Sequence, residues 1–454
     1  HSSIVSRFKK FQGRKLLNLT STPESSLTGL ASCPGDKSIS QRVLMISSLI
    51  NEPIKIKGFL DGEDPLSTMH ALNQMGAEIE IHPKNVIQVK KSLTGFVEPI
   101  DPLDLGNSGT GLRLMLGMIA GLGIKTTFKG DNSLSQRPMS RVLDPLSAMG
   151  ADITSNNGML PIALNKSVLD DNFVYELPVA SAQVKSCILL AGLAAQKTVT
   201  IIEPIQTRDH TERMLKNFGA NITIAQKDSK NIICLAGKAS LKAMDYQVVG
   251  DISSAAFLIV GALISQSEKL EICDVGMNPS RIGVLNVLRD MGARIEVKNA
   301  REESGEPIAD LIVLPSKLSG VILDGSIIPN IIDEIPILSI AAAFAEGNTI
   351  IRDAAELRVK ESDRLSAISN GLAKLGVVHE NLDDGIKIQG NPGLLDIPRP
   401  VQIDSFHDHR IAMSFLIAGL NCNQPITVLE CDNIFTSFPT FLELTASLGY
   451  DIKK

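Results

Sequence analysis

The sequence ALNQMGAEIE (71–80) returns along the chain as PLSAMGADIT (145–154), MLKNFGANIT (214–223) and VLRDMGARIE (287–296), with weaker copies GLAKLGVVHE (371–380) and ELTASLGYDI (443–452). Each copy is a short helical stretch, then a glycine, then residues typical of a strand. A glycine in this place closes a helix in the left-handed conformation, so the pattern predicts six helix–strand junctions. The glycines lie 74, 69, 73, 84 and 73 residues apart, which indicates one unit repeated six times.

Each repeat also contains a helix that is apolar on almost every side. These helices are RVLMISSLI (42–50), GLRLMLGMIAGLG (111–123), AQVKSCILLAGLAA (182–195), SSAAFLIVGALIS (253–265), EIPILSIAAAFAEG (334–347) and HRIAMSFLIAGLN (409–421). A helix without a polar face must be buried on all sides. The segments are too long and too rich in alanine for buried strands.

The repeat is therefore predicted to be β-α-β-α-β. Three repeats plus three predict two α/β domains, with helices inside and sheets outside, divided near Gly250. The one long spacing contains the polar stretch REESGEP (301–307), which we expect to form an exposed loop.

The composition narrows the class of protein. The 454 residues carry a net charge of −6, and aromatic residues make up 4% of them. Proteins that bind nucleic acids usually combine a basic face with stacking rings, so we expect no nucleic-acid partner. No uncharged apolar run reaches the roughly 18–20 residues of a membrane span, so we expect no membrane association either.

The cysteines and the first residues indicate the compartment. The six cysteines form no C-x-x-C pair, which argues against a zinc site and a disulfide framework and fits thiols in a reducing cytoplasm. Residues 1–15, HSSIVSRFKKFQGRK, are basic and lack the apolar core of a signal peptide, so we expect a loose tail there.

Polar and charged residues gather where the buried helices begin. The six starts read PGDKSISQR (34–42), LGNSGTGLR (105–113), PVASAQVKS (178–186), VGDISS (249–254), NIIDEIP (330–336) and SFHDHR (405–410). Helix capping accounts for Asp251, Ser253 and Ser254. It accounts less well for the remaining side chains, which are Lys37, Arg42, Gln183, Asp333 and Arg410. A cation opposes the positive N-terminal end of a helix, and a bound anion would remove that conflict. The starts therefore predict a cleft that holds a multiply anionic small molecule.

Further basic residues lie outside these starts. QRPM (136–139) supplies Arg137, QTRDHTER (206–213) supplies Arg208, and LRVKESDRL (357–365) places Lys360, Glu361 and Arg364 within one helical turn. A surface salt bridge between Glu361 and Arg364 is the simpler explanation of the last motif. The sequence contains no phosphate loop and no dinucleotide fingerprint, so neither a nucleotide kinase nor a dinucleotide dehydrogenase is expected.

Together these motifs resemble the 5-enolpyruvylshikimate-3-phosphate (EPSP) synthase family, the 3-phosphoshikimate 1-carboxyvinyltransferases. The resemblance rests on PGDKSISQR, LGNSGTGLR, QRPM, ASAQVKS, TRDH, DEIPILSIAAAFAEG, LRVKESDRL and DHRIAMSFL, in order over about residues 16–454. It implies the enolpyruvyl transferase fold, two inside-out α/β domains of three repeats each with buried parallel helices and outer sheets. It also implies an N-terminal domain over 34–249, a C-terminal domain over 16–33 and 250–454, and an active site in the cleft between them.

The resemblance implies transfer of the enolpyruvyl group of phosphoenolpyruvate (PEP) to the 5-hydroxyl of shikimate 3-phosphate (S3P), with release of phosphate and without a metal or a cofactor. PEP would be held by Lys37, Arg137, Arg364 and Arg410, against the backbone of Gly109. S3P would be held by Ser38, Arg42, Ser181, Ala182, Gln183, Arg208 and Lys360. Asp333 would bind near the 5-hydroxyl and act as base, Glu361 would protonate the methylene carbon, and Lys37 would assist at the bridging oxygen.

Within the family, the motifs resemble the bacterial class whose members are often insensitive to glyphosate. Insensitive members carry alanine where this chain has Gly109, so we predict that glyphosate inhibits it. Thr436, in FTSFP (435–439), replaces a lysine of the better-known class, and Ala182 replaces a second serine that many members have.

Two other functions stay open at this point. UDP-N-acetylglucosamine enolpyruvyl transferases share the fold, but they use a loop cysteine and a Lys-Asn pair. This chain has Lys37-Ser38 and no cysteine between Cys33 and Cys187. A non-catalytic anion-binding protein would keep the arginines, and the intact Asp333 and Glu361 argue against it. We expect a cytoplasmic monomer whose partners are its two small-molecule substrates.

Overall fold

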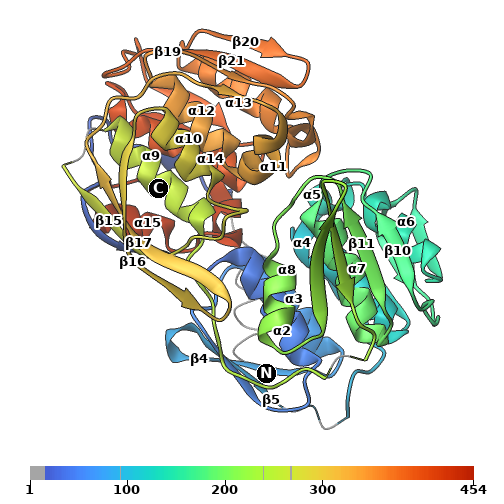
Figure 1. Cartoon of the computed structure of the whole chain (residues 1–454). Helices are drawn as coiled ribbons and strands as arrows, with labels where there is room; N and C mark the ends of the chain where they lie inside the picture. The colour runs from blue at the N-terminus through green and yellow to red at the C-terminus, as the bar shows by residue number, and fades with distance from the viewer. Residues whose placement is uncertain (1–15, 91, 93, 239, 266–267) are drawn as a thin grey trace. The chain divides into compact units, whose positions relative to one another are not determined.

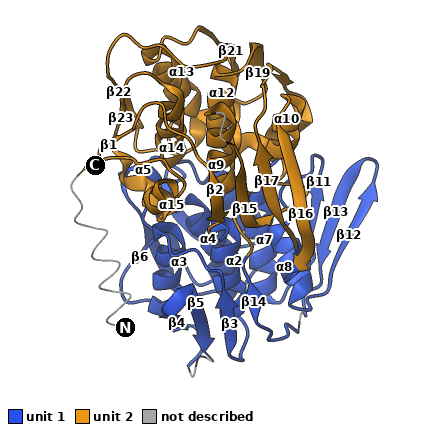
Figure 2. Cartoon of the chain, turned by 90° about the vertical axis from the view of Figure 1, so that its left-hand side faces the viewer, with its two compact units in different colours: residues 1–9, 35–248, 303–306 blue, residues 10–34, 249–302, 307–454 orange. Residues whose placement is uncertain are grey.

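The structure is a computed structural model that describes residues 16–454, except 91, 93, 239 and 266–267 (Figure 1). The tail expected at 1–15 lies outside the described residues. The described chain groups into two compact units (Figure 2). Unit 1 contains Gly35–Val248 and Glu303–Glu306, and unit 2 contains 16–34, Val249–Glu302 and Pro307–Lys454.

Unit 1 consists of three repeats. The first comprises α2 (Lys37–Ser48), β3 (Ile54–Lys57), α3 (Glu63–Gln74), β4 (Glu78–His82), η1 (Pro83–Asn85) and β5 (Val86–Lys90). The second comprises β6 (Leu103–Asp104), α4 (Gly109–Leu122), β7 (Thr126–Lys129), α5 (Asn132–Ser135), α6 (Ser140–Ala148), β8 (Ile153–Asn156) and β9 (Met159–Leu164). The third comprises β10 (Phe173–Glu176), α7 (Ala182–Ala195), β11 (Val199–Glu203), α8 (His210–Asn217), β12 (Ile222–Lys227) and β13 (Lys230–Leu235), and β14 (Tyr246–Gln247) follows it.

Unit 2 consists of three more repeats. The first comprises α9 (Ile252–Ile264), β15 (Leu270–Gly276), α10 (Gly283–Asp290), β16 (Arg294–Glu303) and β17 (Glu306–Leu314). The second comprises β18 (Ile322–Leu323), η2 (Gly325–Ile327), α11 (Ile328–Ile331), η3 (Ile332–Glu334), α12 (Ile335–Ala343), β19 (Gly347–Ile351), η4 (Ala355–Val359), α13 (Arg364–Lys374), β20 (His379–Leu382) and β21 (Gly385–Gly390). The third comprises β22 (Val401–Asp404), α14 (His409–Ala418), η5 (Gly419–Asn421), β23 (Ile426–Leu429), η6 (Cys431–Thr436) and α15 (Phe441–Ser447). Unit 2 also contains the early strands β1 (Leu19–Thr20) and β2 (Gly29–Ser32).

The six apolar helices form the inner layer of the two units, as predicted. Helices α2, α4 and α7 pack together in unit 1, and α9, α12 and α14 pack together in unit 2. Every residue of α9 and α12 is buried. Small residues permit the closest approach, because a Cβ at Gly117 of α4 would lie 2.1 Å from the carbonyl oxygen of Cys187 in α7. The predicted helix 334–347 ends earlier, at Ala343, because β19 already begins at Gly347.

The glycines of the repeated pattern close their helices as predicted. Each stands directly after the C-cap residue and has a positive φ, from 70° at Gly376 to 106° at Gly292. A residue with a Cβ pays steric strain in this conformation, which explains the recurring glycine. The strand predicted after the sixth glycine does not form in the described residues 450–454, where Lys453 makes only an isolated bridge to Thr20.

The repeat contains one strand more than predicted. In five of the six repeats the second helix is followed by a hairpin of two antiparallel strands, such as β4–β5 and β12–β13. The prediction of β-α-β-α-β was wrong here, because it contains one strand after the second helix where the structure has two. The result is one outer sheet per repeat, five with four strands and one with three.

The first sheet of each unit is completed by a strand from the point where the chain passes between units. The strand β2, which precedes α2 in the sequence, pairs with β15 of unit 2. The strand β14, which precedes α9, pairs with β3 of unit 1. In the later repeats the strand before the buried helix pairs with the strand after it, as β6 does with β7. The chain thus exchanges two edge strands where it leaves one unit for the other.

The stretch REESGEP (301–307) does not form an exposed loop as expected. It forms the ends of β16 and β17 and their turn, in which Ser304 and Gly305 have φ of 50° and 82°. Glu306 is 1% exposed and lies 2.6 Å from Nδ1 of His210 on α8. The polar residues therefore serve a hairpin tip that packs within unit 1.

One helical segment, Gly325–Ala343, is long and apolar enough to cross a membrane by length and composition. It is built from η2, α11, η3 and α12 in succession, and 72% of its most apolar stretch is buried inside the structure. Such burial is typical of the core helix of a packed domain, and this segment belongs to the inner layer of unit 2.

Candidate active site

The predicted site residues fall into two groups, one in each unit. The group in unit 1, here called the anion site, consists of Lys37, Ser38, Arg42, Gly109, Arg137, Ser181, Ala182, Gln183 and Arg208. The group in unit 2, here called the carboxylate cluster, consists of Asp333, Lys360, Glu361, Arg364 and Arg410, together with Asp408. Most of these residues lie at or before the first turn of a buried helix.

Lys37 is the first residue of α2 and is held there by an acidic partner. Asp36 caps the helix by accepting a hydrogen bond from the backbone N–H of Ile39 at 2.8 Å. The ammonium of Lys37 lies 3.0 Å from Oδ2 of Asp64 on α3, and the two side chains are only 11% and 7% exposed. Asp64 thus offsets part of the conflict between a cation and a helix N-terminus, and the sequence motifs gave no sign of this partner.

Arg42 connects three helices of unit 1. Its guanidinium donates to Oγ1 of Thr211 on α8 at 2.8 Å, to Oγ of Ser186 on α7 at 3.1 Å and to the carbonyl of Ser38 at 3.1 Å. The side chain is buried, and the hydroxyls of Ser186 and Thr211 also bond to each other at 2.7 Å. The planar guanidinium is therefore fixed in one orientation.

Gly109 and Arg137 meet at the start of α4. Arg137 lies between α5 and α6 and donates to Asn107 at both its backbone oxygen (3.1 Å) and its side-chain oxygen (2.9 Å). A Cβ placed at Gly109 would lie 2.6 Å from Nη1 of Arg137 and 3.0 Å from Nη1 of Arg113. The missing side chain is what allows these guanidinium groups to approach the helix start.

The start of α7 carries the predicted phosphate ligands of S3P. Ser181 caps the helix, with its hydroxyl accepting from the backbone N–H of Val184, and Ala182 and Gln183 form the first turn. The amide of Gln183 is held at both ends, because it accepts from Arg113 at 2.8 Å and donates to Thr110 at 2.9 Å. Arg113, in the motif LGNSGTGLR, was assigned no role from the sequence.

Arg208, the last predicted residue of the anion site, belongs to another element. It lies in the segment that joins β11 to α8 and is partly buried. The following residue, Asp209, forms an ion pair with Arg213 on α8, with Nε 3.0 Å from Oδ2. The segment is thus ordered at the point where it presents Arg208.

Arg364 is the centre of the carboxylate cluster. It is fully buried, and its guanidinium contacts Asp408 at 2.8 Å, Glu361 at 2.6 Å and Asp333 at 3.4 Å. Burial lowers the pKa of Arg364, but the charges of the three carboxylates raise it by more, so the net shift is upward. Arg364 therefore stays charged despite complete burial.

Asp408 is the partner that the sequence analysis missed. It caps α14 by accepting from the backbone N–H of Arg410 at 2.9 Å, and Ser362 donates to its other oxygen at 2.9 Å. Its motif, DHR, was read only as a source of Arg410. The sequence does contain a sign of this role, since an N-cap aspartate near several arginines can both cap its helix and pair with one of them.

Asp333 lies among three cations. Its Oδ1 is 3.8 Å from Nζ of Lys360 and 3.4 Å from Nη1 of Arg364, and Arg410 donates to its backbone oxygen at 3.2 Å. Burial lowers the pKa of Lys360 even though 25% of the side chain is exposed, and Asp333 opposes that shift. The cluster therefore places carboxylates, which can exchange protons, beside cations, which can bind anions.

The motif LRVKESDRL does not form one helical turn as predicted. The chain is helical over η4, becomes extended at Lys360, and starts α13 only at Arg364. Asp363 interrupts the helix because its side chain caps α13, accepting from the backbone N–H of Ser366. The pair Glu361–Arg364 forms nevertheless, so this contact does not depend on helical spacing.

Thr436, which replaces a lysine of the better-known class, is buried. Its hydroxyl donates to the carbonyl of Asn433 at 2.7 Å within η6. A short side chain bound to the backbone cannot reach a ligand as a lysine does, so this position contributes no positive charge.

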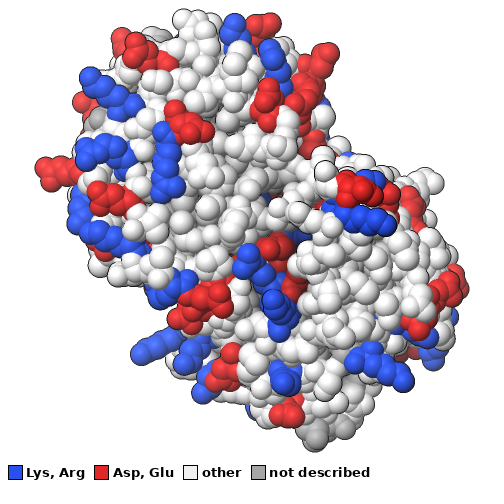
Figure 3. Space-filling view, in the orientation of Figure 1, with Lys and Arg blue, Asp and Glu red and all other residues white. Residues whose placement is uncertain are grey.

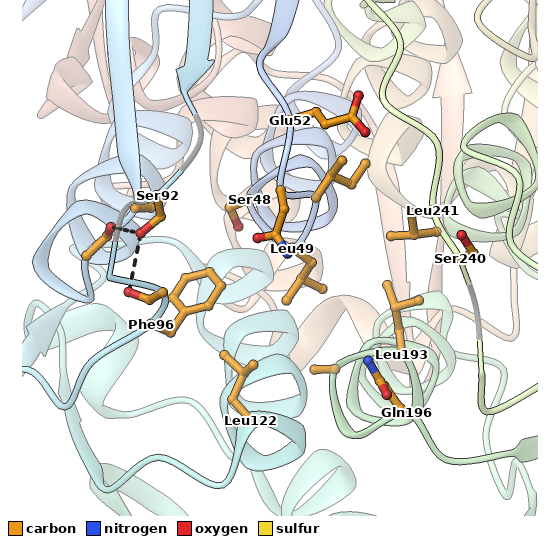
Figure 4. Close-up of a pocket in the computed structure, with 16 residues that line it drawn as sticks. Ser48, Leu49, Glu52, Ser92, Phe96, Leu122, Leu193, Gln196, Ser240 and Leu241 are labelled. Carbon is orange, nitrogen blue, oxygen red and sulfur yellow. Dashed lines mark hydrogen bonds between the residues drawn. The ribbon is translucent and has the colours of Figure 1, made fainter.

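A cavity of about 430 Å³ lies at the opposite end of the inner helices of unit 1 (Figure 4). Its walls include residues at the C-terminal ends of α2, α4 and α7, among them Leu49, Leu122 and Gln196. None of the described residues that line it is lysine or arginine. Helix C-termini repel anions. The cavity therefore does not suit phosphate groups, whereas the N-terminal ends of the same helices do.

Comparisons with known proteins identify the family. The family model of EPSP synthase (3-phosphoshikimate 1-carboxyvinyltransferase) matches residues 21–444. A 3-phosphoshikimate 1-carboxyvinyltransferase of Ruthia magnifica subsp. Calyptogena magnifica is 48% identical over 430 residues, which are 95% of this chain and 97% of that protein. One of Coxiella burnetii (strain RSA 493 / Nine Mile phase I) is 46% identical over 433 residues, again 95% and 97%.

Solved structures agree with these relatives. The EPSP synthase of Acinetobacter baumannii has a TM-score of 0.83 and 41% identity, and the match covers 96% of this chain and 99% of that one. The enolpyruvyl transferase NikO of Streptomyces tendae has a TM-score of 0.76 at 18% identity, which shows a shared fold alone. The predicted enolpyruvyl transferase fold is thereby confirmed. The chain belongs to the EPSP synthase family, the 3-phosphoshikimate 1-carboxyvinyltransferases of the shikimate pathway.

Proposed function

We propose that the anion site and the carboxylate cluster act on one pair of substrates and together form the active site of this chain. The family transfers the enolpyruvyl group of PEP to S3P, and each of these substrates carries a carboxylate and a phosphate. The observation that best supports the proposal is the gathering of Lys360, Arg364 and Arg410 around Asp333 in a chain of net charge −6. The proposal keeps the predicted domains, 34–249 on one side and 16–33 with 250–454 on the other.

PEP is the ligand proposed for four cations. Lys37 and Arg137 of the anion site and Arg364 and Arg410 of the carboxylate cluster would bind its carboxylate and phosphate, with Gly109 against them. Charge-assisted hydrogen bonds contribute roughly 1.5–3 kcal/mol each. Four such groups supply enough binding energy to bring residues of two units to one small ligand.

S3P is the ligand proposed for the remaining residues. Ser38 and Arg42 would hold the ring and its carboxylate, and the start of α7 would hold the phosphate through Ser181, Ala182 and Gln183. A helix N-terminus with a serine cap suits a phosphate, because its N–H groups point outward and its dipole is positive. The positive side chains of Arg208 and Lys360 would complete this binding site.

The chemistry needs one proton removed and one supplied. We assign Asp333 as the base that takes the proton of the 5-hydroxyl of S3P, while the oxygen of that hydroxyl attacks C2 of PEP. Glu361 would give a proton to C3, forming a tetrahedral intermediate. In the second step the bond from C2 to the phosphate oxygen breaks, and the methyl group gives a proton back to the Glu361 carboxylate as the double bond re-forms. The proton that Asp333 took leaves with the phosphate. Lys37 would stabilise the departing phosphate oxygen.

Glu361 must change partners to act as an acid. Its Oε2 is 2.6 Å from Nη2 of Arg364, a contact that favours the ionised carboxylate. We propose that an anionic group of PEP competes for this guanidinium. The guanidinium of Arg364 would then pair with the substrate and no longer with Glu361. Glu361 could then take up the proton that it has to donate.

The finer class of the enzyme is also a proposal. Its motifs favour the bacterial class whose members are often insensitive to glyphosate, but the residue at position 109 favours inhibition. A methyl group there would crowd glyphosate more than the shorter PEP. The space around Gly109, where a Cβ would meet Arg137 at 2.6 Å, supports this view.

We propose that the chain works as a cytoplasmic monomer, without nucleic acid or membrane partners. All six cysteines are thiols in the structure, which fits a reducing compartment. On the face in Figure 3, basic and acidic side chains alternate without a large field of one sign. A nucleic-acid binder would need such a basic field.

The experiment that tests the function is phosphate release from PEP in a metal-free buffer, with and without S3P. We expect release that depends strictly on S3P, with EPSP as the second product by mass spectrometry. Release without S3P, or the same rate with UDP-N-acetylglucosamine, would contradict the assignment. A protein that binds S3P without turnover would be the non-catalytic alternative.

A further inference from the structure

Unit 1 contains a lysine buried among carboxylates that the proposed chemistry does not use. Lys185 lies on α7 and is 1% exposed. Its ammonium is 2.8 Å from Oε1 of Glu203 and 2.7 Å from Oε1 of Glu212, whose side chains are 2% and 3% exposed. Because burial of three charges costs free energy, this arrangement calls for a reason.

The two carboxylates stand at the ends of the segment that carries Arg208. Glu203 is the last residue of β11, and Glu212 lies in the first turn of α8. Within the segment, Thr207 donates to Oε1 of Glu203 through its backbone N–H at 3.0 Å and through its hydroxyl at 2.5 Å. The residue next to Arg208 is thus tied to the carboxylate that Lys185 holds.

The same lysine stands beside the proposed phosphate ligands on α7. Gln183 precedes it by two residues, and its neighbour Ser186 is tied to Thr211 of α8 by a hydrogen bond of 2.7 Å. The first turn of α7 and the segment with Arg208 are therefore fixed to each other through Lys185 and Ser186.

We propose that Lys185 is a positioning residue for S3P, which holds the Arg208 segment against the start of α7 so that both reach the same phosphate. The proposal rests on the proposed function, in which Arg208, Ser181 and Gln183 bind this group. Lys185 itself does not touch the substrate.

We propose that the buried charges fix the position of the segment with Arg208 more than they stabilise the fold. Replacing a buried ion pair with apolar residues is often neutral or stabilising, so stability alone does not require one here. An apolar contact leaves a loop several positions, whereas a lysine between two carboxylates fixes both. The cluster is not saturated, because Oε2 of Glu212 has no hydrogen-bond partner among the described residues. Burial accordingly raises the pKa of Glu212.

The test is steady-state kinetics of Lys185→Met, which keeps the length of the side chain and removes its charge. We expect the KM for S3P to rise about tenfold or more, because one charged anchor of the binding segment is lost. The KM for PEP at saturating S3P and kcat should stay within about twofold and threefold of the parent. A KM for S3P within twofold of the parent would overturn the proposal, as would equal rises of both KM values.

A matched control separates positioning from general loss of stability. Ile87→Ala removes a buried side chain from β5, on an outer sheet of the same unit. We expect it to lower Tm while leaving the KM for S3P unchanged. A rise of that KM in Ile87→Ala as large as in Lys185→Met would show that stability, not position, governs the effect.

A second variant covers the case in which Lys185→Met does not fold. Thr207→Val keeps the shape and removes the hydroxyl bond to Glu203, so it should raise the KM for S3P about threefold. An unchanged KM in this variant would overturn the proposal. Absence of S3P-dependent phosphate release from the parent protein would instead contradict the proposed function, so the two failures are distinguishable.

Discussion

At Gly109 we expect a single added methyl group to weaken the binding of glyphosate more than that of PEP. Replacing it with alanine would place Cβ 2.6 Å from Nη1 of Arg137, so the guanidinium must shift. The end of a long side chain can move at little cost, and PEP, the shorter ligand, should tolerate the change.

We therefore expect that glyphosate inhibits the parent enzyme and that Gly109→Ala raises the inhibition constant about tenfold or more. The KM for PEP should change by only about threefold, and it serves as the internal control. Inhibition constants from initial rates at several PEP concentrations give both values. A parent enzyme that is insensitive at millimolar glyphosate would contradict the prediction.

Asp333 is the residue whose loss should affect turnover more than binding. Since a positioned base contributes about 10²–10⁴-fold, Asp333→Ala should lower kcat by at least about 10²-fold. Binding of S3P, measured by calorimetry, should change little because the cations around Asp333 remain. Glu380→Ala on β20, an exposed site, is the control and should be as active as the parent. Near-normal turnover of Asp333→Ala would remove this residue from the role of base.

The sequence indicated which charged residues are candidates for the site but not which residues hold them in place. Lys37 stood out because a cation at a helix start is unusual, and Arg364 stood out as part of the charged motif LRVKESDRL. Their partners, Asp64 and Asp408, lie 27 and 44 residues away along the chain. Which aspartate faces a given cation depends on how helices of one unit pack, and no local pattern contains that information.

Helix α14 is capped by Asp408, the residue that also holds Arg364, so one substitution can separate the two tasks. Asparagine caps helices about as well as aspartate, but it carries no charge to offset the buried guanidinium. We expect Asp408→Asn to destabilise the protein by about 3 kcal/mol, since a buried charge loses a partner. Chemical denaturation followed by circular dichroism would measure this, and the KM for PEP should rise in parallel.

The neighbouring helix offers the matched control. Asp363 caps α13 in the same way, but its side chain is 39% exposed and its ion pair with Arg358 lies at the surface. Asp363→Asn should cost less than about 1 kcal/mol. Equal losses of stability in the two variants would mean that the cap, not the charge, accounts for the effect at Asp408.

Whole elements were predictable where one physical requirement recurs. The six glycines and the six apolar helices were found because a left-handed helix end and complete burial each restrict composition strongly. The second strand of the hairpin, which five of the six repeats contain, was missed, because a strand such as β13 is mostly half-buried and no repeated pattern marks it. The tip at Ser304 and Gly305 was missed for another reason, since its polar residues have partners in a different repeat.

The exchange of edge strands makes unit 2 depend on the beginning of the chain. Deletion of residues 1–33 removes β1 and β2, which are edge strands of two sheets of unit 2, and leaves the three sheets of unit 1 with all their strands. We expect faster hydrogen exchange in β15 and β23, and unchanged exchange in β3, β7 and β11, by mass spectrometry of peptides. A chain that lacks only residues 1–15 is the control. Unchanged protection of β15 after the longer deletion would contradict this account.

This arrangement also sets an order of events at the ribosome. The strands β1 and β2 are synthesised before the strands with which they pair, because β2 pairs with Leu270–Cys273 of β15 and β1 pairs with Thr427–Val428 of β23. The edge strand β14, in contrast, follows directly on the other strands of the three sheets of unit 1. Domains fold in the order in which they emerge, so the sheets of unit 1 close on the nascent chain. The strands β1 and β2 therefore stay without their partners until the later strands of unit 2 have been made, and in that interval their edges are open to pairing with other chains.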